Sequence, residues 1–314
     1  MIVACGEALV DFTVERSERG PLYRPHVGGA SLNVAVALAR LEVAAAFLGG
    51  LSRDAFGRFL RAQLLASGVD PRYVCERAEP TALAFVQQED GREPAFSFYG
   101  HGTAERVLRP DDLPPAFPPD VEALHFAGYS LHVEPVGTTL ETLGRREQAR
   151  RLIFLDPNVR PALTPDLDAG RARLEAWVRH ADVVKASRAD LDVLYPGSTA
   201  DTVARSWLAR PEGPGPVLVV VTLGADGAAA FHAAGEVRVP SVPVTVVDTV
   251  GAGDAFSAGL LAWLHGARRL TRDGVARLGV SEITAALARA ALVAALTCTR
   301  AGADPPRLAD LAKS

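Results

Sequence analysis

One segment near the end of the chain combines a glycine-rich turn with a carboxylate. Gly251, Ala252, Gly253 and Asp254 follow a β-branched run and open a helical pattern over 254–264. Glycines at a helix start let backbone N–H groups face an anion, and the helix dipole favours negative charge there. A carboxylate at the same place repels a bound phosphate. Asp254 therefore suits a base that takes a proton from a hydroxyl while that hydroxyl attacks phosphorus. The alternative is an ordinary turn with Asp254 as a helix-start carboxylate.

A second glycine pair lies near the start of the chain. Gly28 and Gly29 precede a helical pattern over Leu32–Leu41, and the first turn of that pattern carries Asn33. Two glycines let the backbone approach a ligand closely, and an amide offers both a donor and an acceptor to sugar hydroxyls. The alternative is that Asn33 serves as a local cap for its own helix.

Further polar residues follow apolar runs, at positions where α/β sheets bind ligands. Asp11 comes at the end of the first run, where the alternative is a turn residue. Arg160 closes the segment Asp-Pro-Asn-Val-Arg and suits a phosphate or a sugar hydroxyl, with a loop salt bridge as the alternative. Thr222, Gly224 and Gly227 follow another apolar run and fit a nucleotide-binding turn.

Short apolar runs alternate with helical patterns along most of the chain, which is typical of parallel strands joined by crossover helices. Several runs are apolar at consecutive positions, as expected for strands covered on both faces. The sequence predicts an α/β fold forming a single domain over 1–314. The predicted strands are Ile2–Leu9, Ala45–Leu48, Ala123–Ala127, Leu152–Leu155, Val183–Lys185 and Val217–Val221, and the predicted helices are Leu32–Leu41, Ala55–Leu65, Val136–Arg150, Ala169–Val178 and Asp201–Leu208.

Two stretches interrupt this alternation. Residues 10–14 form one, and the pair 82–88 and 95–98 forms a hairpin pattern around an acidic turn at Glu89, Asp90 and Gly91. We interpret them as a small β excursion that can act as a lid, built from about 10–24 and 80–105.

Composition excludes several classes of protein. The chain has 314 residues, of which 48% are apolar and 22% charged, which is ordinary for a globular protein. The net charge of −4 gives no basic field for a nucleic-acid partner. The three cysteines have no metal-ligand spacing. The run Ile283–Cys298 contains Arg289 and is expected to be too short to span a bilayer, so a cytoplasmic location is expected. A P-loop is absent, and a Rossmann dinucleotide site is not expected.

With these residues in view, the sequence resembles the ribokinase-like (PfkB) family of carbohydrate kinases over its whole length, and within it the bacterial fructokinases. The resemblance is carried by Gly28–Leu41 and Asp248–Leu261, and its fructokinase part by Asp156–Arg160, Ala181–Ser187 with Asp190, Leu194–Gly197, Phe96–Tyr99 with Thr103–Glu105, and Cys298–Pro306. It implies a mostly parallel sheet between two layers of helices with a small β lid. It also implies transfer of the γ-phosphoryl group of ATP to a sugar hydroxymethyl group.

The resemblance also assigns roles to individual residues. Asp254 matches the base, and Gly251, Ala252 and Gly253 match the anion hole. Asp11, Gly28, Gly29, Asn33 and Arg160 match sugar-binding positions, and Thr222, Gly224 and Gly227 match the ATP-binding turn. The resemblance implies Mg²⁺ carried with ATP, often a monovalent cation such as K⁺ near the second glycine segment, and a lid that can join two chains. Many members carry Asn-x-x-Glu where this chain has Ser187 and Asp190, which leaves Asp190 as a candidate for water-mediated contact with Mg²⁺.

Lysine usage adds one further candidate. Only Lys185 and Lys313 are lysines among the 33 basic residues. Lys185 follows two valines at a strand end beside the inferred ATP site. A compact ammonium suits a moving phosphate, so we expect Lys185 to contact the nucleotide phosphates, with a surface lysine as the alternative.

Rival functions remain open at this point. A 2-keto-3-deoxygluconate kinase or another sugar or nucleoside kinase of the family is the nearest alternative, because Arg160 would also suit an acidic sugar. A non-catalytic sugar or nucleotide sensor on the same fold is the alternative of another class, and a dehydrogenase is a more distant one. An intact Gly-x-Gly-Asp argues against a sensor, because a pure binder gains nothing from a carboxylate beside a phosphate.

Overall fold

A nine-stranded sheet forms the centre of the computed structural model, which describes residues 1–18, 20–87, 95–164, 166–209 and 215–312. Its strands are β1 (Ile2–Cys5), β4 (Ala45–Ser52), β5 (Val74–Arg77), β8 (Ala123–Ala127), β9 (Leu152–Asp156), β10 (Val183–Ser187), β11 (Leu218–Thr222), β12 (Ala228–His232) and β13 (Gly235–Val239). They lie in the order β13-β12-β11-β10-β9-β8-β1-β4-β5. The strands from β11 to β5 pair in parallel, and β12 and β13 add antiparallel pairs at one edge.

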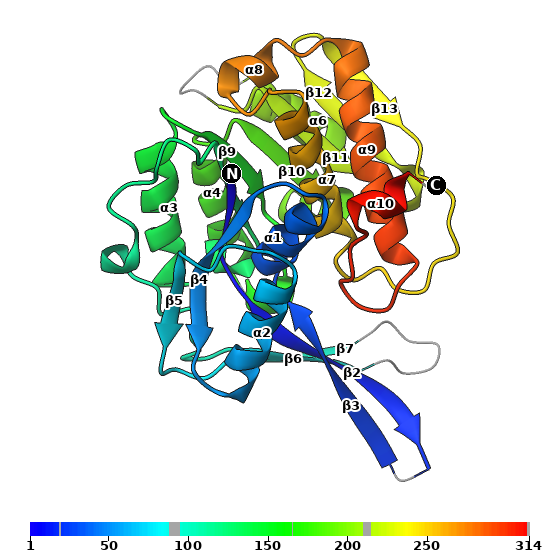
Figure 1. The fold of residues 1–314 in the computed structure, drawn as a ribbon. Helices are drawn as coiled ribbons and strands as arrows, with labels where there is room; N and C mark the ends of the chain where they lie inside the picture. Colours follow the sequence, from blue (N-terminus) through cyan, green and yellow to red (C-terminus); the bar gives the residue numbers. More distant parts are fainter. Residues whose placement is uncertain (19, 88–94, 165, 210–214, 313–314) are drawn as a thin grey trace.

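Helices cover both faces of this sheet (Figure 1). One face packs against α1 (Ala30–Arg40), α2 (Ala55–Ala66), α7 (Ala252–Gly266), α8 (Arg272–Ala276) and α9 (Val280–Cys298). The other packs against α3 (Val136–Glu147), α4 (Leu167–Val178), α5 (Arg188–Leu194) and α6 (Ala200–Leu208). The chain also forms α10 (Leu308–Leu311) and the 3-10 turns η1 (Pro110–Asp112), η2 (Tyr129–Leu131), η3 (Pro161–Leu163) and η4 (Gly224–Asp226). The predicted α/β fold with helices on both faces is confirmed.

A second sheet of four strands stands apart from the main one. It consists of β2 (Leu9–Ser17), β3 (Gly20–Gly28), β6 (Leu83–Gln87) and β7 (Ala95–Tyr99), in the order β3-β2-β6-β7. Figure 1 shows β2 and β3 extending away from the body of the molecule. We call these four strands the small sheet. The acidic turn expected between β6 and β7 lies outside the described residues.

The start of the chain differs from the prediction. We expected one strand over Ile2–Leu9 with Asp11 at its end, but β1 ends at Cys5 and Asp11 lies on β2 of the small sheet. The break falls at Gly6, which has a φ of 149° and whose Cβ, if present, would lie 2.3 Å from Ser31 Oγ. Asp11 therefore approaches the site from the small sheet and not from the central one.

The helix α9 also differs from the prediction. It has 19 residues and is long and apolar enough to span a membrane by length and composition, whereas the run from 283 to 298 was expected to be too short. In the structure α9 packs against α7, β12 and β13. Its apolar character therefore serves packing against these elements of the core.

Candidate functional site

Two cavities adjoin each other at the ends of the parallel strands and α7. The first has a volume of about 800 Å³ and the second about 560 Å³. They share the residues Asn158, Arg160, Pro161, Thr249 and Gly253. A group passing from one cavity to the other therefore passes the N-terminus of α7.

The N-terminus of α7 is shaped by glycine. Gly251 caps the helix with a φ of 75°, a left-handed conformation that favours glycine, and a Cβ there would lie 2.6 Å from Ala303 Cβ. Gly253 lines both cavities. The first N–H groups of a helix have no partner within the helix, so this turn presents donors at the wall between the cavities, although the Ala252 N–H also donates to the carbonyl oxygen of Thr249 at 3.2 Å. The structure thus places Gly251, Ala252 and Gly253 where an anion hole is expected.

Asp254 lies in the first turn of α7 and is 6% exposed. Its Oδ2 accepts a hydrogen bond from Asn33 Nδ2 at 2.8 Å, and its Oδ1 accepts one from Asn158 Nδ2 at 3.3 Å. Burial raises the pKa of Asp254 to about 7, although the bond from Asn33 acts in the opposite direction. A carboxyl with a pKa near neutrality is suited to accept a proton from an alcohol.

The second cavity contains most of the predicted sugar-binding residues. Asp11, Gly29, Asn33 and Arg160 all line it, together with Asp254. Gly28 does not line it, but a Cβ on Gly28 would lie 2.1 Å from Asp11 Oδ2, so glycine makes room for that carboxylate. Burial raises the pKa of Asp11 to about 6, while Arg160 lowers it.

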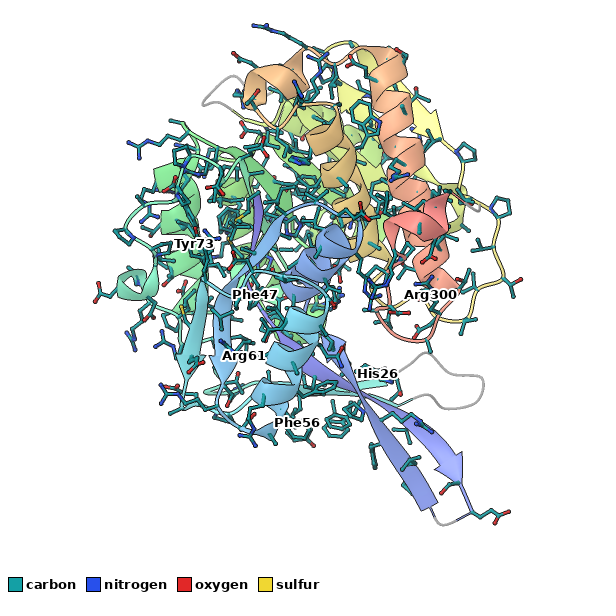
Figure 2. The ribbon with its side chains drawn as sticks, viewed as in Figure 1. His26, Phe47, Phe56, Arg61, Tyr73 and Arg300 are labelled. Atoms are coloured by element: carbon teal, nitrogen blue, oxygen red, sulfur yellow. The ribbon has the colours of Figure 1, made fainter. Side chains whose placement is uncertain are left out.

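The small sheet and η2 add polar and aromatic walls to which the sequence assigned no individual role. Thr13 and His26 line the second cavity, with Thr13 Oγ1 and His26 Nε2 2.9 Å apart. Figure 2 marks His26 on β3, and a Cβ on Gly302 would lie 3.1 Å from its Nδ1. Phe98 of β7 and Tyr129 line the same cavity with their ring centroids 5.2 Å apart. These rings had no recognisable spacing, because their segments are distant in sequence.

The first cavity contains the predicted nucleotide-binding residues. Lys185, Thr222, Gly224 and Gly227 line it, as do apolar side chains suited to a flat ring: Val242, Val244, Phe256, Ala291 and Ala295. Gly224 and Gly227 have φ values of 62° and 93°, and a Cβ on Gly227 would lie 2.0 Å from the carbonyl oxygen of Val239. Glycine is therefore required for this turn.

Asp190 lines the first cavity but is held by protein donors. Its Oδ1 accepts from Val159 N at 2.8 Å, and its Oδ2 accepts from Ser187 N at 3.0 Å and Ser187 Oγ at 2.7 Å. It therefore fixes the loop that carries Asn158 and Arg160. Within the described ranges, no group of three or more His, Cys, Asp or Glu side chains could hold a metal ion. The Asp190 carboxylate beside the first cavity fits a Mg²⁺ ion that is held mainly by phosphates and water.

Lys185 is not a surface lysine. It is 3% exposed, lines the first cavity, and donates to Asp156 Oδ2 at 2.9 Å. The sequence marks Asp156 only as the start of a loop motif. Its pairing with Lys185 depends on two adjacent strands, β9 and β10, and no local pattern reports such a contact.

Comparisons with known proteins agree with this geometry. Residues 1–309 match the pfkB family carbohydrate kinase description. The chain is 42% identical over 279 residues to a fructokinase of Rhizobium leguminosarum bv. trifolii, covering 88% of this chain and 84% of that protein.

Two solved structures are similar along almost the whole chain. The fructokinase of Xylella fastidiosa with bound ATP has a TM-score of 0.88 at 32% identity, covering 99% of this chain and 97% of that one. A double mutant of the fructokinase of Vibrio cholerae, with fructose, ADP and potassium bound, has a TM-score of 0.84 at 29% identity, covering 99% and 97%. Matched from residue 1 to residue 309, with its Gly-x-Gly-Asp turn between two cavities, the chain belongs to the pfkB family of carbohydrate kinases.

Proposed function

We propose that this kinase is a fructokinase, which transfers the γ-phosphoryl group of ATP to the hydroxymethyl group of fructose and forms fructose 6-phosphate. The observation that carries the mechanism is the position of Asp254, buried at the wall shared by a sugar-sized and a nucleotide-sized cavity. Relatives named fructokinase support the choice of sugar.

In this mechanism Asp254 accepts the proton of the attacking hydroxyl. The N–H groups at Gly251, Ala252 and Gly253 stabilise the negative charge that spreads over the transferring phosphoryl group. Arg160 lines both cavities and lowers the pKa of Asp254 by its positive charge, so it stands where the γ-phosphate must pass. The protein thus acts by positioning and by electrostatics.

The remaining cavity residues hold the two substrates. In the second cavity Asp11 and Asn33 bind sugar hydroxyls, and Gly28 and Gly29 let the backbone come close to the ring. In the first cavity Thr222, Gly224 and Gly227 bind the nucleotide. Lys185 contacts its phosphates, since an ammonium has three donors and can serve both Asp156 and a phosphate oxygen.

The proposed reaction also involves two kinds of cation. Mg²⁺ would be carried with ATP, Asp190 would contact it through water, and the ion would neutralise charge on the phosphates. A monovalent cation such as K⁺ binds near the segment from 248 to 254, supported by the potassium in the related Vibrio structure. We also propose that the small sheet is a lid that closes over the sugar and joins two chains, and that the enzyme is cytoplasmic.

The test of the base is Asp254→Asn. We expect kcat to fall by on the order of 10² to 10⁴ or more, because the amide cannot take the proton. Binding of ATP and fructose, measured by titration calorimetry, should stay close to the wild type, because the amide keeps the size of the carboxyl. Wild-type turnover in the variant would remove Asp254 from this role.

The choice of sugar is tested on the wild-type enzyme in a coupled ADP-release assay. Fructose, ribose, 2-keto-3-deoxygluconate and nucleosides are compared at equal concentration. Fructose should give the highest kcat/KM. A higher kcat/KM for 2-keto-3-deoxygluconate would show that this acid, and not fructose, is the preferred substrate. A lack of activity on every compound would indicate a sensor.

A further inference from the structure

A buried ion pair lies behind the anion-hole turn. Lys185 and Asp156 are 3% and 0% exposed, and Lys185 Nζ lies 2.9 Å from Asp156 Oδ2. The hydroxyl of Ser257 donates to the same Oδ2 at 2.9 Å. Ser257 follows Asp254 by three residues on α7, so both side chains lie on one face of the helix. One carboxylate oxygen therefore joins Lys185 to the helix that carries the base.

The ammonium lies directly against the start of α7. A Cβ on Gly253 would be only 3.1 Å from Lys185 Nζ. A larger residue in place of Gly253 would therefore crowd the ammonium. A buried ion pair contributes little to stability compared with apolar side chains of similar volume. Its presence at this place is better explained by the chemistry of the turn than by the stability of the sheet.

We propose that Asp156 and Lys185 form a positioning unit for the transfer step, in which Asp156 fixes the Lys185 ammonium beneath the N-terminus of α7 so that its charge acts on Asp254 and on the phosphoryl group in transit. Ser257 links the unit to α7, so the Lys185 ammonium stays at a fixed distance from Asp254. The inference rests on the proposed role of Asp254 as that base.

The surroundings of Asp254 allow the unit to be tested. Asn33 of α1 and Asn158 after β9 are its neutral neighbours, and the charged ones are Arg160, Asp156 and Lys185. Asp156 raises the pKa of Asp254, whereas Lys185 lowers it. The two members of the pair therefore act on the pKa of Asp254 with opposite sign, so removing one charge or both should shift that pKa in different ways.

The experiment measures kcat/KM for fructose against pH at saturating ATP. Asp156→Asn keeps an oxygen for Lys185 and Ser257 but leaves the ammonium uncompensated. The acidic limb of the kcat/KM profile, where Asp254 loses its proton, should move to lower pH by about one unit or more. Adding Lys185→Met removes the ammonium without leaving a buried carboxylate alone. In this double variant the limb should move back up by a similar amount.

A matched control is Asp182→Asn. Asp182 is 3% exposed, accepts from Arg272 at 2.9 Å, and lines neither cavity. This variant should unfold more easily and keep the wild-type pH profile. If Asp156→Asn and the double variant both lose turnover but keep the wild-type limb, the pair is only structural and the proposal is overturned. Failure of the base itself would appear separately, as wild-type turnover in Asp254→Asn.

Discussion

At the scale of single residues, the burial of Asp254 has opposite consequences for catalysis and for stability. Its pKa is raised from 3.8 to about 7, chiefly by burial. The folded chain therefore keeps a proton that the unfolded chain releases between these pH values. Stability that depends on this proton is present at low pH and is lost as the pH rises from about 4 to 7. The proposed base Asp254 is ionised, and so able to accept a proton, in the pH range where its contribution to stability is lowest.

We expect Asp254→Asn to raise the melting temperature at pH 8, because an amide has no buried charge. The difference from the wild type should shrink as the pH is lowered and disappear near pH 4. Thermal unfolding without ligands measures it. Asp168→Asn is the control, since Asp168 is 86% exposed and its variant should differ little from the wild type at any pH. Equal melting temperatures for Asp254→Asn and the wild type at pH 8 would contradict the conclusion that burial of the charged Asp254 carboxylate destabilises the fold.

Site residues could be predicted from the sequence where they lie in short, recognisable motifs. Asp254, Gly253 and Asn33 sit in short motifs, and the structure brings them to one place. Ser257 and the pairing of Asp156 were not predicted. A serine in an apolar helix has no distinctive pattern, and the pairing with Lys185 exists only once β9 lies beside β10.

At the scale of elements, the end of β7 is tied to the body through Glu105. This side chain is 1% exposed and accepts hydrogen bonds from Thr103 Oγ1 at 2.5 Å and Tyr129 Oη at 2.7 Å. The guanidinium of Arg106 lies 5.5 Å and 5.3 Å from the ring centres of Phe98 and Tyr129. Glu105 thus holds the Tyr129 ring of the body directly, and Phe98 of the small sheet packs against that ring at the second cavity.

Glu105→Ala should therefore weaken sugar binding more than nucleotide binding. We expect KM for fructose to rise about tenfold, as loss of a hydrogen bond to a charged group allows, with KM for ATP nearly unchanged. Steady-state kinetics with each substrate varied measures both constants. Glu147→Ala is the matched control, because Glu147 is also 1% exposed but pairs with Arg151 away from both cavities. Equal changes in the two KM values would contradict the assignment.

Element prediction from the sequence succeeded where burial on both faces left a continuous apolar run. The strand predicted at Ala123–Ala127 has the bounds of β8. The pair β12 and β13 was missed. Three alanines open β12, and alanine has low strand propensity, so its place in the sheet depends on pairing with β11.

At the scale of the whole molecule, one face of the small sheet is aromatic and partly exposed. The rings of Phe12 and Phe85 stack with their centroids 4.8 Å apart. The ring centroids of Tyr23 and Tyr99 each lie 5.6 Å from that of Phe85. Tyr23 is 46% exposed and Tyr99 63%. Figure 2 shows Phe56 of α2 beside the small sheet, where it contacts Phe12 at 5.6 Å. Such a face suits contact with a second copy of the chain.

The proposed dimer predicts a sedimentation mass near twice 33.1 kDa at micromolar concentration. The double variant Tyr23→Glu with Tyr99→Glu should sediment as a monomer, because two charges would be buried in the contact. Val280→Glu, which changes a 49% exposed apolar residue on α9, is the control and should remain dimeric. A monomeric wild type would exclude the contact.

The scarcity of lysine has a consequence beyond catalysis. Arginine carries all but two of the 33 basic charges, and of the two lysines Lys185 is buried beside the nucleotide cavity. Arginine is not a substrate for the acyl-transfer chemistry that modifies amines. Apart from the chain terminus, acetylation and related amine modifications therefore have only Lys313 and Lys185 as targets. If Lys185 contacts the nucleotide phosphates as proposed, acylation of its amine would remove that positive charge and lower phosphoryl transfer, whereas acylation of Lys313 would leave the charge beside the first cavity in place.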